Sequence, residues 1–337
     1  MTDLTTENRG VAGGAALASL EAHAATLETT PGWITREQPI FWAEPRPEAR
    51  AAHWRYAGIR SALEDAARLV DLSLAERRIL ALRNPFPGNN FATTRTLSCS
   101  YQYMLPGETA STHRHASHAL RIMLDAAGTY SIVDRLRMPM ETGDIVLTPG
   151  GCWHGHGHDG DRPACWMDVL DIPLTHLLEP MYFELWSATA ATSRSAEKPG
   201  RIQTAERSVD ACPWRFSAAD IARLLDQVEA AKPLEHGARI VLRAPELPTM
   251  GIAVDRLRPG ARTDRHRSTA SRCITVTAGA GRSRIGTELF DWQFGDTFAI
   301  PSWVWYEHES LELSQLVEIS DEPVMRMCNY YREEVAA

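Results

Sequence analysis

The strongest constraint on the fold of this 337-residue chain is an internal repeat. Matching positions in the two halves are 153 residues apart early in the repeat and 152 residues apart later in it. The pairs are Gly107 and Gly260, His113 and His266, His115 and Ser268, Gly128 and Gly281, Gly143 and Gly295, Pro149 and Pro301, His154 and Tyr306, and His156 and His308. Six of the eight pairs are identical, which chance rarely produces at a near-constant interval. We therefore expect a duplicated domain.

Each copy of the repeat is predicted to consist of a helix followed by short strands. The segment 53–70 resembles the segment 213–230, with Trp54 matching Trp214. In the second segment apolar residues recur at helical spacing from Ile221 to Val228, which predicts an amphipathic helix. From about residue 75 to 175 short alternating runs are interrupted by Gly and Pro, which is typical of strands and hairpins. The chain is therefore expected to be mainly β.

These patterns divide the chain into four expected regions. They are an N-terminal arm with helices (1–74), a first β domain (75–186), a linker with a helix (187–236) and a second β domain (237–337). Within them, residues 14–28 are Ala-rich and helical in pattern. Residues 187–200 are small and polar and end in Pro-Gly, which favours a linker.

Composition excludes several classes of partner. The net charge is −8, and no stretch dense in Lys and Arg carries interleaved aromatic residues, which argues against a nucleic-acid surface. The six cysteines form no CxxC pair, which favours reduced thiols over a disulfide framework. The first residues lack the pattern of a signal peptide, and no apolar stretch reaches transmembrane length. We expect a cytoplasmic protein without nucleic-acid or membrane partners.

Three histidines give the clearest chemical signal. His113 and His115 are two residues apart, so on a strand their imidazoles lie on the same face. His154 comes from a later predicted strand and can complete the set. Imidazole is a common ligand of Fe, Zn, Cu and Ni. The pattern therefore predicts a divalent metal site and leaves the choice of metal open.

The glycines and proline around these histidines resemble the two motifs of the cupin family. The first motif, G(x)5HxH, matches Gly107, His113 and His115, and the second, G(x)5PxG(x)2H, matches Gly143, Pro149, Gly151 and His154. The longer stretches "TPGGCWHGHGHDGDRP", "WMDVLDIPL" and "FDWQFGDTFAIPSWVWYEH" closely resemble the gentisate 1,2-dioxygenase family, which includes salicylate and 1-hydroxy-2-naphthoate dioxygenases. The resemblance implies a bicupin, with two tandem double-stranded β-helix (jelly-roll) barrels, flanking helices and an N-terminal helical arm.

The resemblance also implies an activity. Relatives hold one Fe(II) per chain with three neutral histidines, here His113, His115 and His154, form tetramers, and open an aromatic ring with O2 between its carboxyl- and hydroxyl-bearing carbons. No carboxylate follows the HxH motif here; Ala119, Leu120 and Arg121 occupy that region. A divalent metal that keeps its full charge favours an anionic 2-hydroxybenzoate. We expect the substrate to be gentisate or a 5-substituted salicylate such as 5-nitrosalicylate, and the enzyme to take part in the catabolism of aromatic compounds.

Parity along the strands suggests the residues that face this substrate. Arg121 lies six residues after His115, an even number, and an arginine there can clamp a carboxylate in a bidentate pair. His156 shares the side of His154 and, by resemblance, Asp168 organises the substrate end; both are the expected catalytic residues. The resemblance also implies that Gln102 and either Arg77 or Arg78 bind the substrate, and Ser98 and Ser100 share the strand face of Gln102 and are further candidates. Each has a purely structural alternative, such as a salt bridge or a buried hydrogen bond.

The second repeat restricts the metal site to one barrel, and two other functions remain as alternatives. Only His266 survives of the three ligand positions in the second repeat, so the C-terminal cupin is expected to be metal-free and to stabilise the first or build an oligomer interface. Three histidines and a water can also form a zinc site for a hydrolase or isomerase. A non-catalytic cupin that binds an aromatic acid is the other alternative.

Overall fold

The computed structural model describes residues 14–33, 41–71, 77–187, 214–231 and 235–336. The chain forms two compact units, residues 1–46 and 47–337. The first unit contains α1 (Gly14–Thr26), which confirms the helix predicted in the Ala-rich arm. Within the described ranges, every helix is too short or too polar to cross a bilayer. Most of the predicted linker, and residue 74 at the first predicted boundary, lie outside the described residues.

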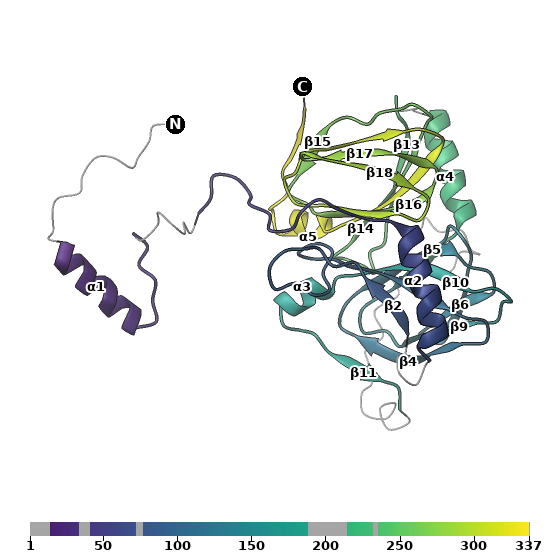
Figure 1. Cartoon of the computed structure of the whole chain (residues 1–337), viewed down its shortest axis with the longest axis horizontal. Helices are drawn as coiled ribbons and strands as arrows, with labels where there is room; N and C mark the ends of the chain where they lie inside the picture. The colour runs from purple at the N-terminus through teal and green to yellow at the C-terminus, as the bar shows by residue number, and fades with distance from the viewer. Residues whose placement is uncertain (1–13, 34–40, 72–76, 188–213, 232–234, 337) are drawn as a thin grey trace. The chain divides into compact units, whose positions relative to one another are not determined.

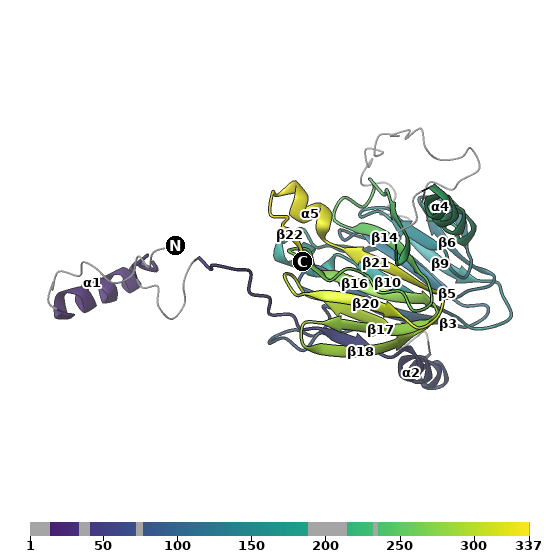
Figure 2. The same cartoon turned by 90° about the horizontal axis from the view of Figure 1, so that it is seen from above.

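The first repeat forms two antiparallel sheets (Figures 1 and 2). The six-stranded sheet has the order β12-β8-β5-β10-β3-β2, with β2 (Arg78–Ala81), β3 (Ser98–Met104), β5 (Ala119–Asp125), β8 (Ile145–Thr148), β10 (Ala164–Leu170) and β12 (Arg215–Phe216). The five-stranded sheet has the order β11-β4-β9-β6-β7, with β4 (Thr109–His115), β6 (Thr129–Val133), β7 (Leu136–Met140), β9 (His154–His158) and β11 (Phe183–Leu185). A short helix, α3 (Ile172–Leu177), connects β10 to β11.

The second repeat has the same architecture, which confirms the duplication and the mainly β fold. Its six-stranded sheet runs β1-β19-β16-β21-β14-β13, with β1 (Ala52–Trp54), β13 (Gly237–Leu242), β14 (Gly251–Leu257), β16 (Arg272–Ala278), β19 (Thr297–Ile300) and β21 (Ser314–Ser320). Its five-stranded sheet runs β18-β17-β20-β15-β22, with β15 (His266–Ser268), β17 (Ala280–Ile285), β18 (Glu288–Gln293), β20 (Tyr306–Ser310) and β22 (Glu333–Val335). The helix α5 (Glu322–Met327) takes the place of α3.

The two repeats exchange short strands. β1 precedes the first barrel in sequence but pairs with β19 of the second, whereas β12 precedes the second barrel and pairs with β8 of the first. Each exchanged strand leads into a helix, α2 (Tyr56–Leu69) or α4 (Ala218–Ala231). The first backbone N–H of α2 donates to Asp296, 2.8 Å away, and that of α4 donates to Asp144, 2.9 Å away. One aspartate in each barrel therefore anchors the helix that the other repeat's leading segment supplies.

The repeated glycine of the second motif makes this exchange possible. Gly143 and Gly295 both have a positive φ, at 88° and 86°. A Cβ atom on Gly143 would lie 2.9 Å from the Cβ of Ala218, and one on Gly295 would lie 2.2 Å from the ring of Tyr56. The glycine therefore provides both the left-handed backbone of the turn and the space for the first residue of the exchanged helix.

The six-stranded sheets of the two barrels pack face to face across a common apolar core. Residues at odd positions of β3 (Cys99, Tyr101, Tyr103) lie in this core beside Ile252 and Val254 of β14. Two matched hydrogen bonds flank the core: Thr249 donates to Asp171, and Thr96 donates to Asp321, each over 2.6 Å. The barrels are therefore joined by the same kind of contact at both ends of the interface.

The buried Asp321 carboxyl makes stability depend on pH. Burial raises the pKa of Asp321 from 3.8 to about 6. The hydrogen bonds from Thr96 and the Ser271 N–H act in the opposite direction and lower this pKa. A carboxyl whose pKa is higher in the folded state than in the unfolded chain favours folding most at low pH. Its contribution is fully present below about pH 4 and is lost by about pH 6, a change of about 3 kcal/mol in the free energy of unfolding.

We therefore expect Asp321→Asn, which keeps one carbonyl acceptor, to remove this part of the pH dependence. Urea unfolding of the wild type and the variant between pH 4 and pH 7 measures it. The exposed Glu288→Gln is the control and should leave the profile unchanged. Identical pH profiles for the wild type and Asp321→Asn would contradict the assignment.

Candidate metal centre

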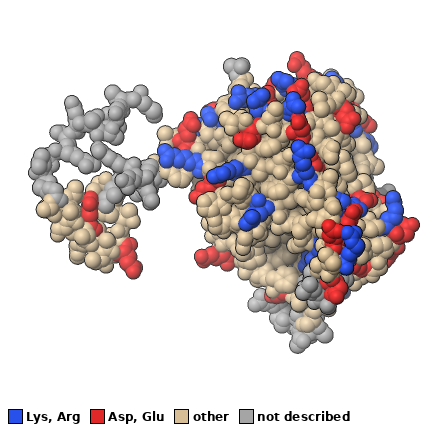
Figure 3. All heavy atoms as spheres, in the orientation of Figure 1, with Lys and Arg blue, Asp and Glu red and all other residues tan. Residues whose placement is uncertain are grey.

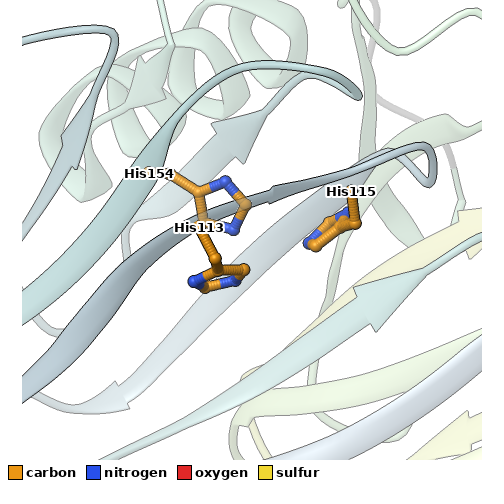
Figure 4. Close-up of side chains that lie close together, drawn as sticks. All are labelled: His113, His115 and His154. Carbon is orange, nitrogen blue, oxygen red and sulfur yellow. The ribbon is translucent and has the colours of Figure 1, made fainter. Parts of the chain in front are cut away.

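The three histidines of the sequence motifs converge in the first barrel (Figure 4). His113 and His115 lie on β4, and His154 begins β9 directly opposite His113 in the antiparallel pair. All three are buried, and one ring nitrogen of each lies within 4.8 Å of the others. Within the described part of the chain this is the only His, Cys, Asp or Glu cluster with such geometry.

Backbone carbonyls fix which nitrogen of each ring is available. The Nδ1 atoms of His113, His115 and His154 lie 2.8, 2.8 and 3.0 Å from the carbonyl oxygens of Ser111, Ser117 and Cys152. A carbonyl oxygen accepts hydrogen bonds only, so each Nδ1 carries the proton and each Nε2 presents a lone pair. Metal-binding histidines are commonly oriented by such a contact through their second nitrogen.

Burial keeps these imidazoles neutral. Desolvation lowers the pKa values of His113 and His115 to about 4, with the positive charge of Arg77 adding to the effect at His113. The pKa of His154 falls to about 2, through burial and then through Arg121. A neutral imidazole is the form that binds a metal.

The residues present fit a divalent metal. The Nε2 atom of His154 is buried and has no hydrogen-bond partner, which is costly unless a ligand satisfies it. The cluster contains three neutral nitrogen donors and no carboxylate, so it would leave the charge of the ion uncompensated. The donor set suits Fe, Zn, Cu or Ni.

The structure separates the two arginine candidates. The Nη2 atom of Arg77 lies 3.1 Å from Nε2 of His113, at the metal centre. Arg78 turns away: its Nη1 donates to both carboxylate oxygens of Glu108 over 2.7 and 2.8 Å, and its Nε donates to the carbonyl of Val70. In this structure Arg78, a substrate-binding candidate in the sequence, forms an ion pair with Glu108 instead of reaching the metal centre.

Strand parity places the other candidates inside the barrel. Met104, Met123 and Trp166 belong to the apolar cluster of the barrel interior, whereas their strand neighbours face the core between the barrels. The even-numbered positions of β3 and β10 and the odd-numbered positions of β5 therefore face inward. These inward positions include Ser98, Ser100, Gln102, Arg121 and Asp168, all buried.

Arg121 is held by protein groups on two sides. Its Nη1 donates to Oγ1 of Thr148 over 2.6 Å, and its Nε lies 3.1 Å from Oδ1 of Asp168, within ion-pair distance though not aligned for a hydrogen bond. Oδ2 of Asp168 accepts a hydrogen bond from Nε1 of Trp166 over 3.1 Å. Burial lowers the pKa of Arg121 and raises that of Asp168, and their attraction opposes both shifts. The sequence reasoning named Arg121 and Asp168 separately and missed Thr148 and Trp166, which connect to them.

His156 is buried with both ring nitrogens unpartnered. Its ring centroid lies 6.0 Å from that of His154 and 6.0 Å from that of Trp166, in an edge arrangement with the indole. Burial, and then the charge of Arg121, lower its pKa well below 6.5, so the ring is neutral and can donate at one nitrogen and accept at the other. Such a side chain is suited to contact a bound molecule.

The small serine side chains are also placed inside the barrel. The hydroxyl of Ser98 donates to the carbonyl of Phe91 over 3.0 Å. Ser100 lies opposite Asp168 in the strand pair, and Gln102 lies opposite Trp166. These three residues therefore line the same wall of the interior as the Arg121 and Asp168 pair.

The second barrel replaces this arrangement with internal ion pairs. His266, Ser268 and Tyr306 occupy the positions of the three histidines, and the rings of His266 and Tyr306 are 4.0 Å apart. The buried Glu318 contacts Arg239 at 2.8 Å and Arg272 at 3.2 Å. Their charges lower the pKa of Glu318 to about 2, although burial opposes this. The arginines of the second barrel are thus neutralised by its own carboxylates.

Comparisons with known proteins agree with this geometry. Residues 100–170 match the Cupin domain family. Gentisate 1,2 dioxygenase 1 of Aquipseudomonas alcaligenes is 30% identical over 93% of this chain and 94% of its own length. The 5-aminosalicylate 1,2-dioxygenase of a Comamonas species is 31% identical over 87% of this chain and 84% of its own length. Salicylate 1,2-dioxygenase of Pseudoaminobacter salicylatoxidans, in a crystal structure with gentisate, superposes with a TM-score of 0.84 at 26% identity, covering 100% of this chain and 97% of that one.

Proposed function

Because the chain belongs to the gentisate and salicylate 1,2-dioxygenase family of cupin ring-cleaving oxidoreductases, we propose that it opens the ring of a 2-hydroxybenzoate with O2 at an Fe(II) ion held by His113, His115 and His154. The observation that carries the proposal is the set of three buried, neutral imidazoles with oriented Nε2 atoms. When bound, the ion would supply the Lewis acidity and the redox chemistry toward O2 that cleavage between the carboxyl- and hydroxyl-bearing carbons needs.

The charge of the first barrel supports an anionic substrate. The positive charge of Arg77 lowers the pKa of His113, and that of Arg121 lowers the pKa of His154. Asp168 is the carboxylate that pairs with Arg121. The guanidinium of Arg77 lies at the metal centre, and a divalent metal on three neutral imidazoles would add further positive charge there. A carboxylate on the substrate would neutralise it, in contrast to the second barrel, where Glu318 already does so for its arginines.

The protein groups have distinct roles in this proposal. Arg77 and Arg121 orient the substrate carboxylate from two sides of the metal centre. Neutral His156 donates a hydrogen bond to an oxygen of the reacting group. Asp168 balances the charge of Arg121 and keeps its guanidinium in place. The enclosing apolar residues Met104, Met123 and Trp166 exclude water and so strengthen these contacts.

We propose that Ser98 and Ser100 determine which substituent the ring of the substrate can carry. Their side chains are small, and they line the wall that also carries Gln102. Small polar residues there leave room for a substituent, which favours gentisate or a 5-substituted salicylate such as 5-nitrosalicylate. We keep both as the proposed substrates.

The surface is consistent with a small-molecule substrate. Figure 3 shows acidic and basic side chains interspersed on the displayed face. The cytoplasmic location, the tetramer and the boundaries of the four regions expected from the sequence stay predictions.

An oxygen-electrode experiment tests the function. Protein reconstituted with Fe(II) is expected to consume one O2 per substrate with gentisate, 5-nitrosalicylate or another 5-substituted salicylate, in a screen that also includes salicylate and 1-hydroxy-2-naphthoate. Zn(II)-loaded protein is the control and should consume none, because zinc has no redox chemistry. Absence of O2 uptake with every 2-hydroxybenzoate, or a hydrolytic activity of the Zn(II) form, would overturn the proposal.

A further inference from the structure

We propose that Thr148 is a positioning residue for Arg121, and that its hydroxyl directs the guanidinium toward the carboxylate of the substrate. This inference rests on the proposed function and extends it to a residue without a metal or substrate contact of its own. Arg121 is 3% exposed and Thr148 is fully buried, so the polar atoms of both depend on contacts within the protein.

The contacts define how the guanidinium is held. Nη1 donates to Thr148 Oγ1 at 2.6 Å, while Nε faces Asp168 Oδ1 at 3.1 Å. Asp168 is itself fixed by the indole N–H of Trp166. The guanidinium is thereby restrained at two of its three nitrogens, by groups on opposite neighbouring strands. Nη2 is the nitrogen left to contact a substrate.

The register of the sheet makes Thr148 the natural acceptor. Arg121 on β5 lies opposite Val146 of β8 on one side and opposite Asp168 of β10 on the other. Thr148 pairs with Ala119, two residues before Arg121, so it is the diagonal neighbour on the same inward face. A long side chain reaches its diagonal neighbour across antiparallel strands.

The second repeat provides an internal comparison. The positions that match Arg121 and Thr148 are Ile274 and Ile300, both buried apolar residues on β16 and β19. These two positions therefore carry neither the guanidinium nor the hydroxyl in the second barrel, whose buried Arg272 instead donates to Oγ of Ser268 over 2.6 Å and faces Glu318. In each barrel a buried hydroxyl thus accepts from Nη1 of a buried arginine, from Arg121 in the first and from Arg272 in the second.

Removing the hydroxyl should redirect the arginine. Without an acceptor, Nη1 would be a buried unsatisfied donor, and the guanidinium would rotate toward the Asp168 carboxylate. Asp168 would then engage two guanidinium nitrogens, and the substrate carboxylate would lose its contact. A charge-assisted hydrogen bond of this kind corresponds to a change of about 10- to 100-fold in binding.

Two variants at one position separate this role from packing. Thr148→Val is close to isosteric and lacks the acceptor, whereas Thr148→Ser keeps it. We expect Thr148→Val to raise the KM for the hydroxybenzoate by about 10- to 100-fold with little change in kcat, and Thr148→Ser to stay within about threefold of the wild type. Thr275→Val removes a buried hydroxyl from the second barrel and is the matched control.

Anaerobic calorimetry with the Fe(II)-loaded full chain gives a readout independent of turnover. The wild type should bind salicylate more tightly than salicylamide, and Thr148→Val should lose most of that preference while iron content and melting temperature stay unchanged. Unchanged salicylate binding in Thr148→Val, or equal losses in the Val and Ser variants, would overturn the positioning role. Failure of the proposed function would appear differently, as a wild type that binds salicylate but consumes no O2.

Discussion

The variant His154→Ala should lose its metal and at least about 1,000-fold of kcat/KM. His154 provides the Nε2 atom that is buried without a protein partner, and it joins the metal centre from a different strand than His113 and His115. Two imidazoles on β4 would remain, which is one ligand fewer than metal sites built on histidine normally use. Elemental analysis after reconstitution, together with O2 uptake, measures both effects.

The internal repeat offers a matched control for this variant. His266→Ala removes the corresponding imidazole of the second barrel, whose neighbouring ligand positions are Ser268 and Tyr306. It should retain one metal ion per chain and near wild-type turnover. Two ions per chain in the wild type, or a loss of metal in His266→Ala, would contradict a single centre in the first barrel.

Replacing Arg121 should weaken substrate binding strongly while the metal stays bound. Arg121→Met keeps the length of the side chain and removes the guanidinium, so we expect kcat/KM to fall by about 100- to 1,000-fold. The change also leaves the buried Asp168 without its counter-charge, which should lower the free energy of unfolding by about 3 to 5 kcal/mol. Metal content should remain at the wild-type level.

The double variant Arg121→Met/Asp168→Asn separates substrate binding from stability. Removing both charges should restore most of the lost stability, because no uncompensated charge is left in the interior. It should not restore substrate binding, since the positive group is still missing. Chemical unfolding and anaerobic substrate titration measure the two quantities. A double variant with a wild-type KM would show that Arg121 serves the fold alone.

The spacing of a few residues was enough to predict much of the site. The HxH pair and the later histidine predicted a three-histidine cluster, and the structure brings these side chains within 4.8 Å. Even spacing from His115 predicted that Arg121 faces inward, and the structure places it on the same face of β5 as Met123, in the barrel interior. The pairing of His113 with His115 depends on alternation within one strand, whereas His154 and Arg121 were placed by spacing across loops.

The choice between Arg77 and Arg78 could not be made from the sequence. The two residues are adjacent in sequence, and adjacent residues of a strand face opposite sides, so the sequence does not show which of them points into the barrel. The pairing of Arg78 with Tyr103 on β3 fixes this orientation and aims Arg78 at Glu108. A contact between strands, distant in sequence, therefore decides which arginine reaches the metal centre.

By itself, the sequence determined that the protein is a duplicated β structure with one complete three-histidine motif, because periodicity and motif spacing are properties of single strands and turns. Only the tertiary structure decided that the repeats exchange β1 and β12, that Thr148 and Trp166 hold Arg121 and Asp168, and that the second barrel neutralises its own arginines. These contacts join residues from separate strands, and their hydrogen bonds and ion pairs depend on distances that exist only after the sheets have packed.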